Sequence, residues 1–173
     1  MLAYLGLGSN VGDRLAYLQT AVNLLDMRAG EVRRISRVFE TAPMYIEDQP
    51  PFLNAAVEIE TRFEPTALLR AVKEIEEEIG RIVRERNAPR EIDIDLLLML
   101  NGLGAPPLTF ADAELTVPHP RLGDRRFALE PLADLAAGLM LDGETVGAAL
   151  SRDDIQKQDV KPLKDAVLSI HRD

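Results

Sequence analysis

Asp93 and Asp95 are the residues whose type and spacing point most directly to chemistry. They stand in the segment EIDIDLLLML, and residues two apart in a strand project from the same face, about 6.5–7 Å apart. The apolar residues around them indicate a buried strand, where unpaired carboxylates are costly. Two interpretations follow. The pair belongs either to an exposed polar face or to a site for Mg²⁺, which prefers carboxylate oxygens and completes its shell with water and substrate phosphates.

A cluster of arginines directly precedes this acidic pair, in the connector 81–90: Arg81, Arg84, Arg86 and Arg90. Arginine binds phosphate oxygens bidentately. The alternative is a solvated connector that pairs with the preceding glutamates, which would account for only part of the cluster. Carboxylates for Mg²⁺ beside arginines for phosphates is the arrangement that phosphoryl-type transfer requires.

A second basic cluster lies in the segment VPHPRLGDRRF, which contains His119, Arg121, Arg125 and Arg126. His119 is either a structural histidine or a donor to a phosphate or a ribose hydroxyl. Because the chain has only 2 histidines, a multi-histidine metal site is not expected.

Two further segments carry features of a binding site. The segment GLGSNVGDR lacks the Lys-Ser/Thr ending of a Walker A loop, so we interpret residues 8–12 as a turn that allows another segment to approach closely. Phe52 and Asn54 share one strand face, and Phe127 follows the second basic cluster. Aromatic rings and an amide can hold a flat heterocycle, although composition alone favours two core phenylalanines.

Hydrophobic periodicity predicts the elements that must position these residues. We expect strands over 2–7, 32–41, 52–61 and 92–100, and helices over 13–27, 64–79, 127–137 and 145–150. A Pro-rich loop over 42–51 separates the second and third strands. The β-α-β-β-α-β order is the ferredoxin-like arrangement. It predicts an α+β fold with an antiparallel four-stranded sheet, helices on one face, and additional C-terminal helices.

Length and composition limit the classes of protein. The 173 residues, 46% of them hydrophobic, fit one domain, which we place at 1–151, followed by a polar extension over 152–173 that forms either a weak terminal helix or a mobile tail. The absence of Cys excludes disulfide scaffolds and thiolate sites. A net charge of −9 and few aromatic residues disfavour an RNA-binding domain. No segment predicts a membrane span or a signal peptide, so we expect a cytoplasmic protein.

Several segments together resemble the 6-hydroxymethyl-7,8-dihydropterin pyrophosphokinase family of folate biosynthesis. They are LGLGSNVGDR, FETAPMYIEDQPPFLNAAVEIET, IEEEIGR, APREIDIDLLL and TVPHPRLGDRRFALEPL, in the family's order over about residues 2–135. The resemblance implies transfer of pyrophosphate from ATP to the pterin hydroxymethyl group, with release of AMP and with two Mg²⁺ ions. It implies small-molecule substrates. The net charge and the lack of a membrane-spanning segment predict no nucleic acid or membrane partner, and we expect a monomer or weak homodimer.

The resemblance also assigns roles to individual positions. Asp93 and Asp95 match the magnesium-binding pair, and together with Arg81 and Arg90 they match the catalytic residues. The positions that match the pterin site are Thr41, Ala42, Met44, Phe52, Asn54, Asp93 and Phe127. The positions that match the ATP site are Glu76, Arg84, Arg86, Arg90, Leu96, Thr116, His119 and Arg125.

Three positions depart from the family's common pattern. Asn87 stands where many members have Trp, Val83 where some have a second Arg, and Glu114 where some have an Arg near the nucleotide. These changes concern nucleotide contacts and closure of the connector rather than the acidic pair. A non-catalytic ligand-binding or regulatory module on the same fold is the alternative, but a simple pterin binder would not need Asp93 and Asp95 beside arginines.

Overall fold

The computed structural model describes residues 1–43, 48–82 and 88–171. Its strands are β1 (Leu2–Ser9), β2 (Glu31–Ile35), β3 (Phe39–Thr41), β4 (Phe52–Glu60), β5 (Asp93–Leu100), β6 (Phe110–Ala111), β7 (Thr116–Val117), β8 (Met140–Leu141), β9 (Glu144–Thr145) and β10 (Val160–Pro162). Its helices are α1 (Arg14–Arg28), α2 (Pro65–Ile79), α3 (Arg126–Ala136), α4 (Val146–Leu150) and α5 (Asp153–Gln156), with a 3-10 turn at Leu122–Asp124.

The main sheet has the order β10-β3-β4-β1-β5, with β2 also paired to β4, and all of these pairs are antiparallel. The predicted ferredoxin-like α+β arrangement is therefore confirmed, but the described part of the sheet has six strands rather than the four expected, with β10 as an additional edge strand. The strand expected over 32–41 is instead two strands. Ser36 lies between them, and its Oγ accepts a hydrogen bond from the Ala56 N–H at 2.8 Å. A side chain thus replaces the carbonyl of a continuous strand there.

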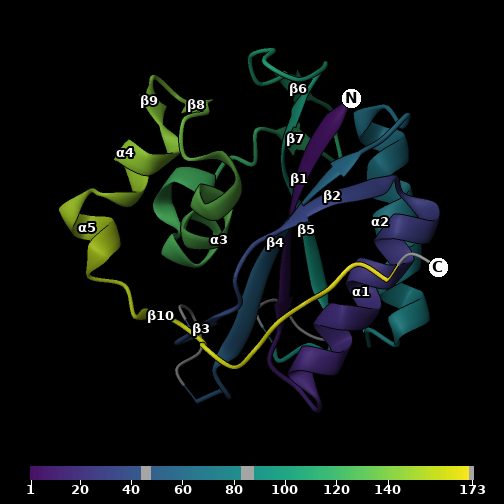
Figure 1. Cartoon of the computed structure of the whole chain (residues 1–173), viewed down its shortest axis with the longest axis vertical. Coiled ribbons are helices and arrows are strands. Elements are labelled where there is room, and N and C mark those ends of the chain that lie inside the picture. Colours follow the sequence, from purple (N-terminus) through teal and green to yellow (C-terminus); the bar gives the residue numbers. More distant parts are fainter. Residues whose placement is uncertain (44–47, 83–87, 172–173) are drawn as a thin grey trace.

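Helices cover both faces of the sheet rather than only the one expected (Figure 1), with α1 and α2 on one side and α3, α4 and α5 on the other. The alternation along β1 explains this arrangement, because apolar side chains point both ways. Ala3, Leu5 and Leu7 belong to the core under α1 and α2, while Leu2 and Tyr4 belong to the core under α3. The sheet therefore lies between two layers of apolar core.

The two core helices begin and end at the signals that the sequence offers. Asp13 caps α1, since its Oδ1 accepts a hydrogen bond from the Ala16 N–H at 3.1 Å. Pro65 opens α2, and Gly80 ends it with a φ of 101°, a conformation that glycine adopts readily. Among the described residues, none of the helices has the length and apolar character needed to cross a membrane.

The C-terminal segment packs against the rest of the fold, which corrects the expectation of a weak terminal helix or mobile tail. It contains the short helix α5 and the strand β10. Leu168 is 7% exposed within the core under α1, and Gln19 exchanges two hydrogen bonds with the backbone of Ser169. The boundary of a 1–151 domain stays a prediction.

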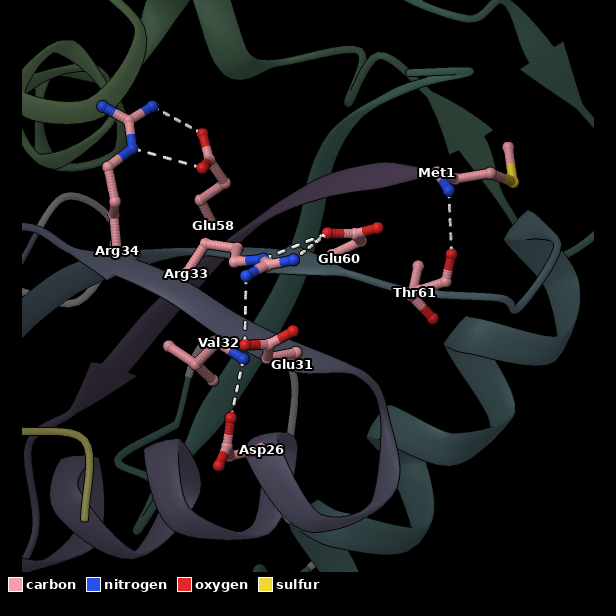
Figure 2. Close-up of polar contacts among 9 residues, drawn as sticks. All are labelled: Met1, Asp26, Glu31, Val32, Arg33, Arg34, Glu58, Glu60 and Thr61. Atoms are coloured by element: carbon pink, nitrogen blue, oxygen red, sulfur yellow. Dashed lines mark hydrogen bonds and ion pairs between the residues drawn. The ribbon is translucent and has the colours of Figure 1, made fainter. Parts of the chain in front are cut away.

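Ion pairs hold β2 against β4 (Figure 2). Arg34 donates to both carboxylate oxygens of Glu58, and Arg33 bridges Glu60 and Glu31. Glu58 is 7% exposed, so the Arg34 pair is the more buried of the two. Asp26 Oδ1 accepts a hydrogen bond from the Val32 N–H of β2 at 2.7 Å. The N-terminal amine of Met1 donates a hydrogen bond to the carbonyl of Thr61.

Candidate functional site

Two glycines of β1 form the floor of a pocket at one end of the sheet. Gly8 lies opposite Asp93 on β5 and opposite Asn54 on β4, and Gly6 lies opposite Asp95. Without side chains at these positions, the neighbouring strands' side chains border an open space. Residues 8 and 9 are thus the end of a strand rather than part of the expected turn. Another segment does approach Gly8 closely, as expected, because a Cβ at Gly8 would lie 3.0 Å from Asn54 Oδ1 on β4.

The pocket gathers most of the described residues that the sequence assigned to the pterin and to the reaction. Its empty space, including the part open to solvent, is about 830 Å³. The assigned residues that line it are Thr41, Ala42, Phe52, Asn54, Arg90, Asp93, Asp95, Arg125 and Phe127. These residues come from the ends of β3, β4 and β5 and from the start of α3.

The two phenylalanines border the pocket rather than filling the core. Phe52 begins β4 and Phe127 lies in the first turn of α3, and both are partly exposed. The Arg125 guanidinium carbon lies 5.5 Å from the centre of the Phe127 ring. Two aromatic side chains from separate elements on one pocket suit a flat ligand.

Asn54 and Thr41 are buried and hydrogen-bonded to each other. Asn54 is 6% exposed and Thr41 3%, and Asn54 Nδ2 donates to Thr41 Oγ1 at 2.8 Å. This bond fixes the amide plane and turns Oδ1 toward Gly8 at the pocket floor. A fixed amide is a specific hydrogen-bonding group for a heterocycle.

Two arginines flank Asp93. Arg81 Nη1 lies 3.1 Å from Asp93 Oδ1, and Arg90 Nη1 lies 2.9 Å from Asp93 Oδ2. Burial, followed by repulsion from Asp93, raises the pKa of Asp95 to about 7. The carboxylates of Asp93 and Asp95 repel each other, so the charge of Asp95 needs a nearby cation or a proton to offset it.

Glu76 binds the backbone at the start of β5. Its Oε1 accepts the Ile94 N–H at 2.7 Å, and its Oε2 lies 2.5 Å from Arg81 Nη1. Burial raises the pKa of the Glu76 carboxyl above its usual value, although both partners favour its charged form. Glu76 does not line the pocket; it links Arg81 to the strand that carries the acidic pair.

The remaining described residues that match the ATP site lie apart from the pocket lining. The Leu96 side chain is 3% exposed in the core under α1 and α2, on the opposite face of the sheet from Asp95. Thr116 is exposed on β7. Burial, with the positive charges of Arg125 and Arg121, lowers the pKa of His119. His119 Nδ1 accepts the Arg121 N–H at 3.1 Å, which places the proton of the neutral ring on Nε2.

Some assignments lie outside the described residues. They are Met44 of the pterin site and Arg84 and Arg86 of the ATP site, together with the departures at Val83 and Asn87.

The structure adds Asn10, whose role the sequence did not indicate. Asn10 is 1% exposed. Its Nδ2 donates to Gln49 Oε1 at 3.0 Å and to the Pro50 carbonyl at 3.2 Å, while its Oδ1 accepts the Arg90 N–H at 2.8 Å. One side chain thus joins the ends of the 42–51 loop and the 81–90 connector. These partners lie 39 to 80 residues away along the chain, so no local pattern signals them.

Arg126, from the second basic cluster, does not line the pocket. Its Nε donates to Glu130 Oε1 at 2.9 Å, and its Nη1 donates to the backbone of the C-terminal segment. Its charge is thus directed to α3 and the chain end, whereas Arg125 borders the pocket.

The donor set at the pocket floor fits Mg²⁺ better than a metal that needs an all-protein cage. Within residues 1–43, 48–82 and 88–171, no group of three or more His, Cys, Asp and Glu side chains is arranged to hold a metal ion. Two carboxylates that leave the rest of the shell to water and phosphate oxygens are the usual Mg²⁺ arrangement in phosphate chemistry.

Comparisons with known proteins agree on one family. The model of 7,8-dihydro-6-hydroxymethylpterin-pyrophosphokinase (HPPK) matches residues 4–137. The 2-amino-4-hydroxy-6-hydroxymethyldihydropteridine pyrophosphokinase of Bacillus subtilis is 44% identical over 135 residues, which cover 78% of this chain and 77% of the relative. The protein of the same name from Methylorubrum extorquens is 42% identical over 152 residues, covering 87% and 92%.

Longer proteins contain the same unit. The folic acid synthesis protein fol1 of Schizosaccharomyces pombe is 42% identical over 140 residues, but these are 18% of its length. The crystal structure of wild-type Plasmodium falciparum HPPK-DHPS with SDX-DHP aligns with a TM-score of 0.65 at 18% identity, over 86% of this chain and 43% of that one. This likeness supports the fold. Because the family model and close relatives cover most of the sequence, the chain belongs to the 7,8-dihydro-6-hydroxymethylpterin-pyrophosphokinase family.

Proposed function

We propose that this chain transfers the pyrophosphoryl group of ATP to the hydroxymethyl group of 6-hydroxymethyl-7,8-dihydropterin, releasing AMP, as a step of folate biosynthesis. Membership of the family supports the reaction. The observation that carries it to this chain's own residues is the Asp93–Asp95 pair at the floor of a pocket bordered by Phe52 and Phe127.

The pterin would occupy the space between the two aromatic side chains. Offset stacking of Phe52 and Phe127 on a flat ring buries both faces of the ring. The fixed Asn54 amide, with backbone groups at Thr41, Ala42 and Met44, would supply the hydrogen bonds that orient it. The contact between Asn54 and Thr41 supports this role, because a preorganised amide pays no ordering cost on binding.

The phosphates of ATP would lie near Asp93, where Arg81, Arg90 and Arg125 supply positive charge. Arg81 and Arg90 already approach the Asp93 carboxylate, which supports a role for them in neutralising the charge of the transferring group. Such preorganised donors are the main contribution of a protein to phosphoryl-type transfer. His119 Nε2 would donate to a phosphate or ribose oxygen. We assign Glu76, Arg84, Arg86, Leu96 and Thr116 to the surroundings of the nucleotide.

Asp93 and Asp95 would hold Mg²⁺, two ions by analogy with the family. Bound there, the metal supplies neutralisation of phosphate charge and a lower pKa for the attacking hydroxyl. The raised pKa of Asp95 supports this assignment, because it indicates a carboxyl whose charge lacks full compensation in the protein alone.

The reaction is an in-line displacement at the β-phosphorus of ATP. A bond forms between the pterin hydroxyl oxygen and the β-phosphorus as the bond from that phosphorus to the α,β-bridging oxygen breaks, and the hydroxyl proton is released to solvent. The leaving group is AMP. Arg81 and Arg90 would stabilise the negative charge on the transferring and leaving oxygens. We also propose that the chain acts in the cytoplasm. We further propose a monomeric or weakly dimeric state, and size-exclusion chromatography with light scattering tests that state.

The product of the reaction tests the proposed function. We would incubate the purified chain with ATP, Mg²⁺ and 6-hydroxymethyl-7,8-dihydropterin and separate AMP from ADP chromatographically. The proposal expects AMP formation that depends on the pterin. Pterin-dependent ADP would mean transfer of a single phosphoryl group, and pterin binding without either product would favour a binding module.

A further inference from the structure

A short C-terminal segment contacts both walls of the pocket. We call residues 156–163 the C-terminal brace. On one side it forms β10, whose Val160 pairs with Thr41 of β3. The Ala42 N–H also donates to the Asp159 carbonyl at 3.2 Å. Thr41 and Ala42 both line the pocket, so the brace holds this wall through its backbone.

On the other side, Gln158 holds the start of α3. Its Oε1 accepts the Arg126 N–H at 2.9 Å, and its Nε2 donates to the Asp124 carbonyl at 2.9 Å. Arg126 in turn donates from Nη1 to the carbonyls of Gln156 at 2.9 Å and Gln158 at 2.8 Å. Four hydrogen bonds thus join the brace to residues 124–126.

These hydrogen bonds bear on ligand binding because they lie at the start of α3, next to the pocket. The first N–H groups of a helix have no partner within the helix, and the N-cap residue Arg125 makes no side-chain cap of its own. Gln158, 32 residues later in the chain, supplies this cap by accepting the Arg126 N–H. Arg125 and Phe127 stand on either side of the capped residue, and both border the pocket.

We propose that Gln158 is a positioning residue for the pterin. Through it, the brace fixes the Phe127 wall relative to the Thr41–Ala42 wall, so that the ring fits between them. The proposal rests on the proposed function. It concerns a residue beyond 4–137, the part that the family model matches. Gln158 acts through Phe127 and does not itself line the pocket.

The test compares three single variants in the full chain. Gln158→Met keeps the length of the side chain and removes both of its hydrogen bonds. Gln158→Glu keeps an acceptor for the Arg126 N–H but cannot donate to Asp124. Lys161→Met is the control, since Lys161 lies on β10 with a side chain that is 77% exposed. For each variant we would measure kcat and the KM values for pterin and ATP, using AMP formation.

The proposal predicts that Gln158→Met raises the pterin KM about tenfold, the effect expected from one or two hydrogen bonds. The ATP KM rises by a clearly smaller factor, because only Arg125 beside the capped residue is assigned to the ATP phosphates. Gln158→Glu gives an intermediate pterin KM, and Lys161→Met behaves as wild type. The ratio of the two KM values separates positioning from partial unfolding, because a smaller folded fraction lowers the apparent kcat and changes neither KM.

An unchanged pterin KM in Gln158→Met, with wild-type enzyme active, would overturn the proposal, as would an equal rise in both KM values. A wild-type chain that forms no AMP would contradict the proposed function itself. In that case direct pterin titration by fluorescence tests Gln158 separately: a weaker affinity for Gln158→Met than for Lys161→Met supports its role, and equal affinities refute it.

Discussion

Gly8 on β1 lies directly opposite Asn54 on β4, and a methyl group at Gly8 would lie 3.0 Å from the Asn54 amide oxygen. The backbone of β1 has no positive φ at this position, so the requirement for glycine is one of space. The small residue leaves room for the amide and for whatever the amide binds.

We predict that Gly8→Ala weakens pterin binding more than it weakens the fold. The added methyl must displace the Asn54 amide or enter the pocket, and overpacking of this kind costs about 1–3 kcal/mol. The pterin KM should rise about tenfold or more, with the ATP KM little changed. Steady-state kinetics with each substrate varied in turn measures both.

Gly102→Ala is the matched control, because nothing lies within 4 Å of a Cβ at that position. This variant should have wild-type kinetics. Equal pterin KM values for Gly8→Ala and Gly102→Ala would show that space at Gly8 does not limit ligand binding.

Glu76 should support the acidic strand mainly by accepting the Ile94 N–H. Glu76→Ala leaves that buried N–H without this acceptor, which costs about 1–3 kcal/mol. Glu76→Gln retains an acceptor of the same length and should be less destabilised. Urea unfolding of the two variants measures the difference, and equal stabilities would exclude this role for the hydrogen bond.

Asn10→Ala should impair the reaction with both substrates. Its three side-chain hydrogen bonds join Arg90 to Gln49 and Pro50, and a misplacement of about 1 Å at a reacting group can cost about 100-fold in rate. We expect kcat/KM to fall for pterin and for ATP alike. Asn23→Ala, which alters only an exposed contact with Gln19 on α1, is the control and should retain wild-type kinetics.

The Arg34–Glu58 pair should make stability sensitive to acid. Burial alone would raise the pKa of Glu58, but hydrogen bonds from Arg34 and Tyr4 outweigh it and hold the pKa below the ordinary 4.5. The unfolded state therefore binds a proton at higher pH than the folded state. The stability that Glu58 contributes is present above pH 4.5 and is lost as the pH falls through the lower, folded-state value.

Glu58→Gln should accordingly be less stable than wild type at pH 7, by about 1–2 kcal/mol, and the difference should shrink toward pH 3. Urea unfolding at a series of pH values measures it. A difference that stays constant from pH 7 to pH 3 would contradict the assignment of this acid dependence to Glu58.

The sequence predicts the acidic pair well because its signal is local. A strand fixes Asp93 and Asp95 on one face whatever the rest of the fold does, and the apolar residues Ile94 and Leu96 fill the other face. The helices and their caps are local in the same sense. The order of elements then leaves the ferredoxin-like sheet as the natural way to pair the strands.

What the sequence does not predict depends on contacts between distant residues. The break at Ser36 exists because a side chain meets Ala56 across the sheet. The strand β10 is three residues long, and its partner β3 lies far earlier in the chain. Nothing in the polar segment around Gln158 indicates that it caps α3 from the chain end.

The most direct test of the account compares pterin-dependent AMP formation by wild type and Asp95→Ala, in the presence of Mg²⁺. Asp165→Ala serves as the control, because Asp165 is exposed. Loss of a positioned charge-stabilising group costs about 10²–10³ in rate, and loss of a metal ligand adds to it. We predict that wild type and Asp165→Ala form AMP, and that Asp95→Ala stays folded by circular dichroism but loses at least about 10³-fold in kcat. Near-normal turnover by Asp95→Ala would contradict the account.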